Sequence, residues 1–186
     1  MRQKKNFISQ FFKNKKMIGS MVPSSRFLAK KMLQHIDFKK SKVIVELGPG
    51  TGVFTDRLLE LMEPDCTLLI FELNDTFYHQ LSNRINDSRV QLIHDSAERL
   101  SDYLKHFNLD QADVIVSSLP LANFPKSLRE NILNVSQDVL TENGKFVQFQ
   151  YSLQSKKAIS STFDRVKIDF TPLNFPPAFI YTGYKK

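Results

Sequence analysis

Short apolar runs alternate with longer amphipathic segments through most of the chain. Five runs have the length and the β-branched or aromatic content of strands: KVIVELG (42–48), TLLIFEL (67–73), RVQLIHD (89–95), ADVIVSS (112–118) and KFVQFQY (145–151). Segments with helical periodicity lie between them, such as TDRLLELM (55–62) and SLRENILNVSQDVL (127–140). Strands that alternate with helices are typical of a mostly parallel sheet with helices on both faces. The pattern therefore predicts an α/β fold.

The last two apolar runs differ from the others because no helical segment separates them. VKIDF (166–170) and AFIYTGYK (178–185) are joined through TPLNFPP, and we expect them to form an antiparallel, hairpin-like pair. Asn143 and Gly144 indicate a turn before the fifth strand. The whole pattern predicts a seven-stranded sheet.

Composition narrows the class of protein. The chain has 186 residues, enough for one domain with one sizeable core, and its sixteen Phe indicate a packed globule rather than disorder. A single cysteine, Cys66, allows no internal disulfide and favours a reducing compartment. No apolar run approaches the ~18 residues of a spanning helix, and the N-terminus lacks the apolar core of a secretion signal. We therefore expect a cytoplasmic protein.

Positive charge is concentrated near the N-terminus. Residues 1–42 contain 12 Lys and Arg against one acidic residue, Asp37, whereas the remaining residues contain 14 basic and 18 acidic ones. A basic segment of this kind suits an anionic partner, which is phosphate on a lipid surface or on nucleic acid. A solvated basic tail is the alternative.

The same segment has an apolar face. In NFISQFFKNKKMI (6–18), the side chains that fall on one side of a helix are Phe7, Ile8, Phe11, Phe12 and Ile18. We expect residues 1–41 to form a basic, amphipathic helical arm that lies in the interface of an anionic membrane, beside a catalytic domain at 42–186. The protein would then associate peripherally with the membrane. The alternative is that the Phe face packs over the ligand pocket as a lid.

The first predicted strand runs into a glycine-rich turn, VELGPGTGVFT. Gly48, Gly50 and Gly52 allow the backbone to turn sharply and to approach a ligand without a Cβ in the way. Their G-x-G-x-G spacing differs from the G-x-G-x-x-G of pyrophosphate binders. Glu46, two residues before the first glycine, suits a cationic group of the ligand.

The second and third predicted strands also end in acidic residues. Glu72 stands where its carboxylate can accept hydrogen bonds from both hydroxyls of a ribose. Asp95 could accept a hydrogen bond from an adenine amino group. Open α/β sheets bind ligands at the carboxyl ends of their strands. These acids, together with Glu46, therefore predict a single ligand site.

These residues carry a resemblance to a known family. ELGPGTG, FELN and HDSAERL resemble the successive cofactor motifs of class I S-adenosylmethionine-dependent methyltransferases. The resemblance implies a Rossmann-like sheet of order 3-2-1-4-5-7-6 with strand seven antiparallel. It implies S-adenosyl-L-methionine as cofactor and no metal, with the methionine portion on Glu46 and the glycine loop, the ribose on Glu72 and the adenine beside Asp95. The residues assigned to the cofactor are Glu46, Gly48, Gly50, Gly52, Glu72, Leu73, Asp95, Ser96 and Ser117.

The fourth predicted strand continues into SSLPLANFP (117–125). In this family the loop after the fourth strand lies beside the transferring methyl group. Enzymes that methylate an amino group of a base carry there Asn or Asp, an apolar residue, Pro, and then Tyr or Phe, which stacks on the base. This chain has Ser118 first, keeps Pro120, and has Leu121 where the aromatic residue belongs. Since leucine offers no stacking face, the loop argues against a base as substrate.

Two bacterial groups of this family resemble the chain. The ribosomal RNA adenine dimethylases are similar in the core, but here GSMVPSSRFL stands where they carry G-Q-N-F-L. They also add a helical RNA-binding domain after the last strand, and we expect no such domain here, since the last predicted strand runs almost to Lys186. Phospholipid N-methyltransferases are similar in the serine-flanked S-L-P-L, in the P-S-S-R at 23–26 and in NFPPAFIY at 174–181.

The favoured hypothesis is a methyltransferase that converts phosphatidylethanolamine towards phosphatidylcholine on an anionic membrane surface. The alternative is an N6-dimethyltransferase of ribosomal RNA adenine with RNA as partner, and a third possibility is a lipid- or RNA-binding protein without chemistry. The sequence indicates no protein partner. The residues expected to orient the amine or take its proton are Ser117, Ser118, Tyr151 and Tyr181, with His94 as a further candidate base.

Overall fold

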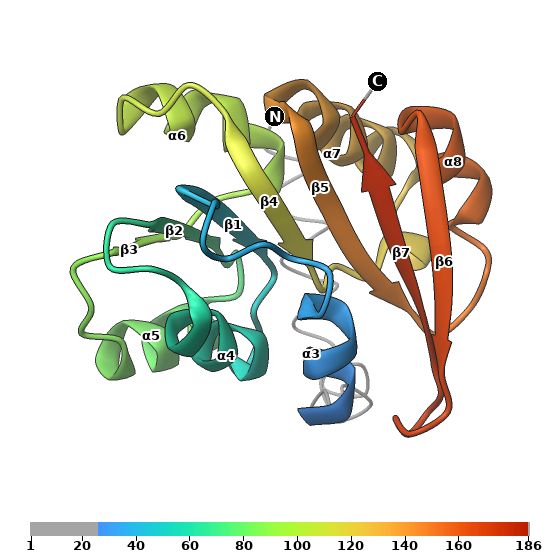
Figure 1. The fold of residues 1–186 in the computed structure, drawn as a ribbon, viewed down its shortest axis with the longest axis horizontal. Coiled ribbons are helices and arrows are strands. Elements are labelled where there is room, and N and C mark those ends of the chain that lie inside the picture. The colour runs from blue at the N-terminus through green and yellow to red at the C-terminus, as the bar shows by residue number, and fades with distance from the viewer. Residues whose placement is uncertain (1–25, 186) are drawn as a thin grey trace.

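The structure, a computed structural model, describes residues 26–185, which contain a seven-stranded sheet (Figure 1). The strands are β1 (Val43–Leu47), β2 (Thr67–Phe71), β3 (Val90–Ile93), β4 (Ala112–Ser117), β5 (Leu140–Gln150), β6 (Arg165–Thr171) and β7 (Ala178–Tyr184). Their spatial order is β3-β2-β1-β4-β5-β7-β6. β7 runs antiparallel to β5 and β6, and the remaining neighbours are parallel. The predicted fold class and strand order are confirmed.

Helices cover both faces of this sheet. The α-helices are α3 (Arg26–Leu33), α4 (Val53–Leu61), α5 (Asp75–Arg84), α6 (Leu100–His106), α7 (Lys126–Val139) and α8 (Lys156–Thr162), and two 3-10 turns are η1 (Ala97–Arg99) and η2 (Leu121–Asn123). α3 and α4 pack on one face, whereas α6, α7 and α8 pack on the other (Figure 1). Within the described part of the chain, no helix is both long and apolar enough to cross a bilayer.

The alternation of side chains along β1 divides the core into two clusters. Val45 and Leu47 pack with α6, α7 and α8, whereas Ile44 packs with α3 and α4. All five residues of β1 are buried, as expected for a central parallel strand with both faces covered. Glu46 is the one ionisable residue of this strand, and it therefore lies inside the protein.

α3 belongs to the packed core although it lies in the range that the sequence assigns to the N-terminal arm. Leu28 and Met32 are almost completely buried, and the helix packs against α4, β5 and β7. The amphipathic segment 6–18 lies outside the described residues. The boundary between residues 41 and 42 remains a prediction.

The turn predicted at Asn143 and Gly144 lies within β5 and does not precede it. Ala112 pairs with Leu140 but Val114 pairs with Lys145, so the β5 side of the pairing contains extra residues. These residues form an irregular stretch near the start of β5, where the register with β4 shifts. The prediction of a turn before the fifth strand is therefore wrong, because Asn143 and Gly144 belong to β5.

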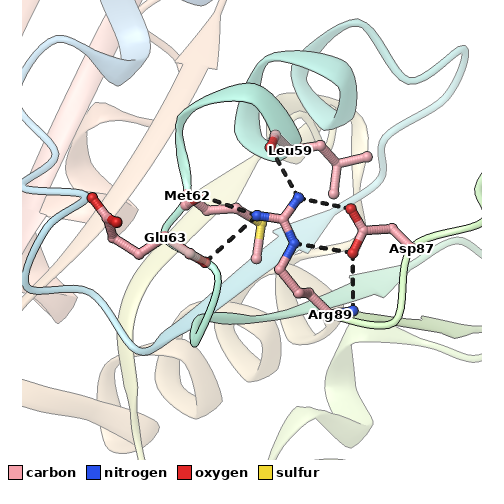
Figure 2. A network of polar contacts seen from close by, with 5 residues as sticks. All are labelled: Leu59, Met62, Glu63, Asp87 and Arg89. Carbon is pink, nitrogen blue, oxygen red and sulfur yellow. Dashed lines mark hydrogen bonds and ion pairs between the residues drawn. The ribbon is translucent and has the colours of Figure 1, made fainter.

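Arg89 joins the end of α4 to the start of β3 (Figure 2). Its guanidinium donates to the carbonyl oxygens of Leu59 (3.1 Å), Met62 (3.0 Å) and Glu63 (3.5 Å). It also forms a two-pronged pair with Asp87 at 3.0 and 2.7 Å. The last carbonyls of a helix have no partner within the helix, and a cation is favourable at this end. The guanidinium in turn lowers the pKa of the Asp87 carboxyl.

Arg89→Ala should lower the free energy of unfolding by about 2–3 kcal/mol, since charge-assisted hydrogen bonds are lost and partly buried acceptors lose their donor. Urea denaturation measures the change. The control is Arg57→Ala, which removes a well-exposed pair with Glu60 on α4 and should cost less than ~1 kcal/mol. Equal losses for the two variants would contradict a structural role for Arg89.

Candidate cofactor-binding site

Three central strands end level with one another. Leu47 of β1 lies opposite Phe71 of β2 and opposite Ser117 of β4. The hydrogen bonds continue one residue beyond the strands: the Gly48 amide donates to the Phe71 carbonyl and the Ser118 amide donates to the Leu47 carbonyl, both at 2.9 Å. The three following loops therefore leave the sheet together, at the edge where open α/β sheets bind ligands.

The glycine loop after β1 requires backbone conformations that other residues adopt with difficulty. Gly48 has a φ of +69°, and a Cβ added there would lie 2.7 Å from Cδ2 of Leu119. Gly52 has a φ of +86° and occupies the N-cap position of α4. The backbone thus passes close to the loop after β4, with no side chain between them.

Glu46 points from β1 towards α4 and is completely buried. Thr55 of α4 donates a hydrogen bond to Oε2 at 2.6 Å, whereas Oε1 has no hydrogen-bond partner among the described residues. Burial, with a smaller contribution from the nearby charge of Glu72, raises the pKa of the Glu46 carboxyl to about 8, although the hydrogen bond from Thr55 opposes the rise. A buried acceptor without a partner suits a cationic group of a ligand.

The raised pKa of Glu46 gives the ligand-free protein a testable pH dependence. In the unfolded chain this carboxyl titrates near 4.5, whereas in the folded protein it titrates at about 8. Between these values the folded state holds a proton that the unfolded state has lost. The free energy of unfolding should therefore fall as the pH rises, by up to ~1.4 kcal/mol per pH unit for one group.

Glu46→Gln should remove most of this slope, because the amide is neutral throughout the range. Chemical denaturation at several pH values between about 5 and 8 measures it. Burial also raises the pKa of Glu72, so this carboxyl also makes the protein less stable as the pH rises. Glu72→Gln serves as the comparison and should remove a different part of the same slope. A slope unchanged in Glu46→Gln would contradict the assignment.

Glu72 connects the glycine loop to the turn after β2. Its Oε2 accepts from the Gly50 amide at 3.1 Å, and its Oε1 accepts from the Asn74 amide at 2.7 Å. Burial raises its pKa, and these backbone hydrogen bonds partly oppose that rise. Each carboxylate oxygen can accept a second hydrogen bond, so a pair of ligand hydroxyls can still be bound here.

Asp95 and Ser96 form the turn after β3. Asp95 accepts from the Ser96 amide at 2.7 Å and from the Tyr103 hydroxyl at 3.3 Å, and its carboxylate lies 3.6 Å from the Arg99 guanidinium. The hydroxyl of Ser96 caps η1 by accepting from the Glu98 amide at 3.3 Å. These bonds fix the turn in place at the edge of the site.

A pocket opens between these turns. It is lined by five of the residues that the sequence assigns to the cofactor: Gly48, Glu72, Leu73, Asp95 and Ser96. Its apolar wall includes Leu119, Phe124 and Ile132, none of which the sequence analysis proposed. Leu119 and Phe124 belong to SSLPLANFP, the stretch that the sequence analysis assigned to the substrate side of the site. Ile132 belongs to the apolar face of α7, and its sequence pattern does not distinguish it from a core residue.

Four of the residues predicted to bind the cofactor do not line this pocket. Glu46, Gly50, Gly52 and Ser117 are not among its lining residues in the described structure. Ser117 is fully buried, and its hydroxyl accepts from the Leu119 amide at 3.4 Å. Their roles towards the cofactor remain predictions.

The loop after β4 is held by two glutamines that the sequence analysis missed. Gln148 and Gln150 of β5 both donate to the Leu119 carbonyl, at 3.0 and 2.9 Å, and Gln150 also accepts from the Ala122 amide at 3.3 Å. Alternate residues of a strand share one face, so polar residues at i and i+2 in the apolar run FVQFQ were the available signal. The hydroxyl of Ser118, in the same loop, is buried and has no partner among the described residues.

Leu121, at the position that matches the stacking aromatic residue of base-methylating enzymes, does not present its side chain to the pocket in the described structure. Its side chain is completely buried in the core cluster that also contains Phe124 and Leu128. The sequence analysis assigned Leu121 to the loop beside the transferring methyl group, and within that loop η2 turns its side chain into the core.

The structure does not bring the three candidate bases into the described pocket. Tyr181 is completely buried in β7 and donates to the Ser152 carbonyl at 3.4 Å, and burial raises its pKa. Tyr151 is partly exposed beyond the end of β5. His94 stacks on Tyr78 with ring centroids 4.3 Å apart and lies 3.2 Å from the Asp75 carboxylate. Among residues 26–185, no three His, Cys, Asp or Glu side chains group together as metal ligands.

The residues at this edge fit S-adenosylmethionine. Oε1 of Glu46, which has no partner within residues 26–185, suits the ammonium of the methionine portion. The glycine loop places no side chain in its way, and Glu72 suits the ribose hydroxyls. When bound, S-adenosylmethionine supplies a methyl group activated by its sulfonium. Fold and site together define a class I S-adenosylmethionine-dependent methyltransferase.

Comparisons with known proteins identify the family. The model of the ribosomal RNA adenine dimethylase family matches residues 2–148, so the chain belongs to that family of methyltransferases. An ornithine lipid N-methyltransferase from Singulisphaera acidiphila is 32% identical over 177 residues, which are 94% of this chain and 92% of that protein.

A further relative and a solved structure are less similar in sequence. Ribosomal RNA small subunit methyltransferase A from Thermotoga maritima is 27% identical over 120 residues, which are 64% of this chain and 39% of that protein. Among solved structures, precorrin-6y C5,15-methyltransferase from Geobacter metallireducens superposes with a TM-score of 0.72 over 90% of this chain and 91% of that chain. At 14% identity this last similarity shows the fold alone.

Proposed function

We propose that this enzyme transfers methyl groups to the primary amine of a membrane-lipid headgroup. The observation that carries the proposal is the similarity to an ornithine lipid N-methyltransferase along nearly the whole of both chains. The match to the ribosomal RNA enzyme, by contrast, covers 39% of that protein.

The loop after β4 supports the same substrate class. Its Ser118 hydroxyl is buried and has no hydrogen-bond partner among residues 26–185, so it can accept a hydrogen bond from an amine N–H. Leu121 is buried in the core and leaves no aromatic face at the position where base-methylating relatives stack their substrate. A small aliphatic amine requires only orientation and a dry environment, which this loop can provide.

The residues of the site would act by positioning. Gln148 and Gln150 hold the Leu119 carbonyl, and this fixes the loop that carries Ser118. Leu119 and Phe124 exclude water from the side of the pocket next to this loop. Only a neutral amine has the lone pair required for attack, so the substrate ammonium must lose its proton before transfer.

Two headgroups satisfy this chemistry. Ethanolamine, favoured by the sequence motifs, and ornithine, named in the relative, each present a primary amine on a flexible aliphatic chain. We therefore propose the lipid primary amine as the substrate class and phosphatidylethanolamine as the first candidate within it.

The test uses full-length protein and S-adenosylmethionine labelled in its methyl group. Separate reactions offer detergent-dispersed lipids and ribosomal RNA. We expect label in the lipid extract with phosphatidylethanolamine or ornithine lipid and none with phosphatidylglycerol, which has no amine. Label confined to ribosomal RNA would establish the alternative. Cofactor binding without transfer to any of these substrates would favour a binding protein without chemistry.

We also propose that the basic arm attaches the enzyme to anionic membrane. Deleting residues 1–18 removes six Lys and Arg together with the apolar face. The truncated protein should bind anionic vesicles less tightly and bind S-adenosylmethionine as before, as vesicle sedimentation and calorimetry would show. If the segment is a lid, cofactor affinity should fall and vesicle binding should persist.

A further inference from the structure

The loop between β6 and β7 exposes large apolar side chains. Phe175 is 82% exposed and Leu173 is 69% exposed, and Phe170 at the end of β6 is half exposed. The sequence from Phe170 to Tyr184 contains no charged residue. Single exposed apolar residues are common, but a group of them within one uncharged loop indicates an interaction site.

The loop is built to hold these side chains outward. Asn174, between Leu173 and Phe175, is almost completely buried, and its side-chain amide donates to the Pro176 carbonyl at 2.7 Å. The three prolines of segment 172–177 further restrict the backbone. The buried Asn174 thus holds Leu173 and Phe175 outward on either side of it, and these two exposed side chains form the apolar tip of the loop.

This tip lies at the same edge of the sheet as the cofactor pocket. β6 is antiparallel to β7, which is antiparallel to β5, so β5 and β6 end at the same edge (Figure 1). Tyr151 and Leu153, just beyond β5, are also exposed. Gln150 at the end of β5 lies opposite Phe179 of β7, which in turn lies opposite Phe170 of β6. The exposed apolar residues of the two segments are therefore neighbours.

Positive charge borders the apolar surface. Lys156 and Lys157 begin α8 and are both exposed, and the Lys156 amide donates to the Leu153 carbonyl at 3.0 Å. Aromatic and aliphatic side chains flanked by lysines are the pattern of a segment that enters the interface of an anionic membrane, where the ammonium groups reach the headgroup phosphates.

We infer that segment 172–177, together with Tyr151 and Leu153, inserts into the surface of an anionic bilayer and holds the carboxyl edge of the sheet against it. The inference rests on the proposed function in one respect, since a lipid substrate gives this contact its purpose. The contact would be separate from the N-terminal arm, and it would set the orientation in which the pocket meets the membrane.

The test compares full-length variants in vesicle sedimentation. Vesicles of phosphatidylglycerol and phosphatidylcholine contain no primary amine, so binding is measured independently of methyl transfer. The pair Leu173→Ser and Phe175→Ser should lower the partition coefficient about tenfold or more at both low and high salt. The matched control, Leu173→Met with Phe175→Leu, keeps the apolar character and should bind like the unmodified protein.

Charge and apolar insertion are separable in the same assay. Lys156→Gln with Lys157→Gln should weaken binding at low salt, and the difference should disappear at high salt because exposed charges are screened. Turnover on detergent-dispersed aminolipid should be unchanged in the serine pair and reduced when the same lipid is presented in vesicles.

Two results would overturn the inference. One is equal vesicle binding by the serine pair and the control pair. The other is dissociation of a dimer by the serine substitutions, seen by light scattering, because a second copy would then be the occupant. Absence of methyl transfer to any lipid would instead refute the proposed function, while the binding measurement would still decide the inference.

Discussion

Replacing Glu72 by Ala should weaken S-adenosylmethionine binding by roughly ten- to a hundredfold while the protein remains folded. The carboxylate stands at the end of β2 with lone pairs free for two ribose hydroxyls, and charge-assisted hydrogen bonds contribute about 1.5–3 kcal/mol. The substitution also leaves the Gly50 amide without its acceptor, so the glycine loop loses support. Isothermal titration measures the dissociation constant.

Two controls separate the loss of ribose hydrogen bonds from the loss of support for the glycine loop. Glu72→Gln keeps an acceptor for the Gly50 amide but removes the charge, and it should fall between the native protein and the alanine variant. Glu60→Ala removes an exposed carboxylate of α4 that pairs with Arg57, and it should bind the cofactor normally. An unchanged dissociation constant in folded Glu72→Ala would remove Glu72 from the site.

Gly48→Ala should lose both stability and cofactor binding. A non-glycine residue at a φ of +69° costs about 1–2 kcal/mol, and the new Cβ at 2.7 Å from Leu119 adds an overpacking cost of about 1–3 kcal/mol. Because Leu119 is a wall of the pocket, its displacement should weaken cofactor binding at least tenfold in the molecules that remain folded. Urea denaturation and cofactor titration measure the two effects.

The matched control for this prediction is Gly183→Ala. Its Cβ would meet the Phe163 ring at 2.6 Å, inside the core and away from the pocket. This variant should lose stability but bind the cofactor normally. If both variants bound the cofactor equally well, the close approach of Gly48 to Leu119 would have no role in the site.

The sheet and the acids could be predicted from the sequence because both follow from local pattern. Strand length, the helices between strands and the glycine turn fix where each parallel strand ends, and parallel pairing then brings Glu72 and Asp95 to one edge. The inward direction of Glu46 follows from its place one residue before the end of β1.

The walls of the site could not be predicted in the same way, because they depend on how distant segments pack. η2 turns Leu121 into the core, and this turn is set by contacts with α7 that no local pattern reveals. Tyr181 lies in an apolar strand whose alternation assigns it to a face of the sheet but does not say what covers that face. The role of Gln148 and Gln150 depends on the position of the loop after β4, because both side chains donate to the Leu119 carbonyl of that loop.

The substrate class is the central claim, and one competition experiment tests it most directly. Full-length protein is incubated in a single tube with S-adenosylmethionine carrying a deuterated methyl group, dispersed phosphatidylethanolamine and ornithine lipid, and ribosomal RNA. Mass spectrometry of the separated lipids and nucleosides then locates the label. We predict deuterated methyl groups on the headgroup nitrogen of an aminolipid and none on adenine. Label on adenine with none on lipid nitrogen would contradict the account.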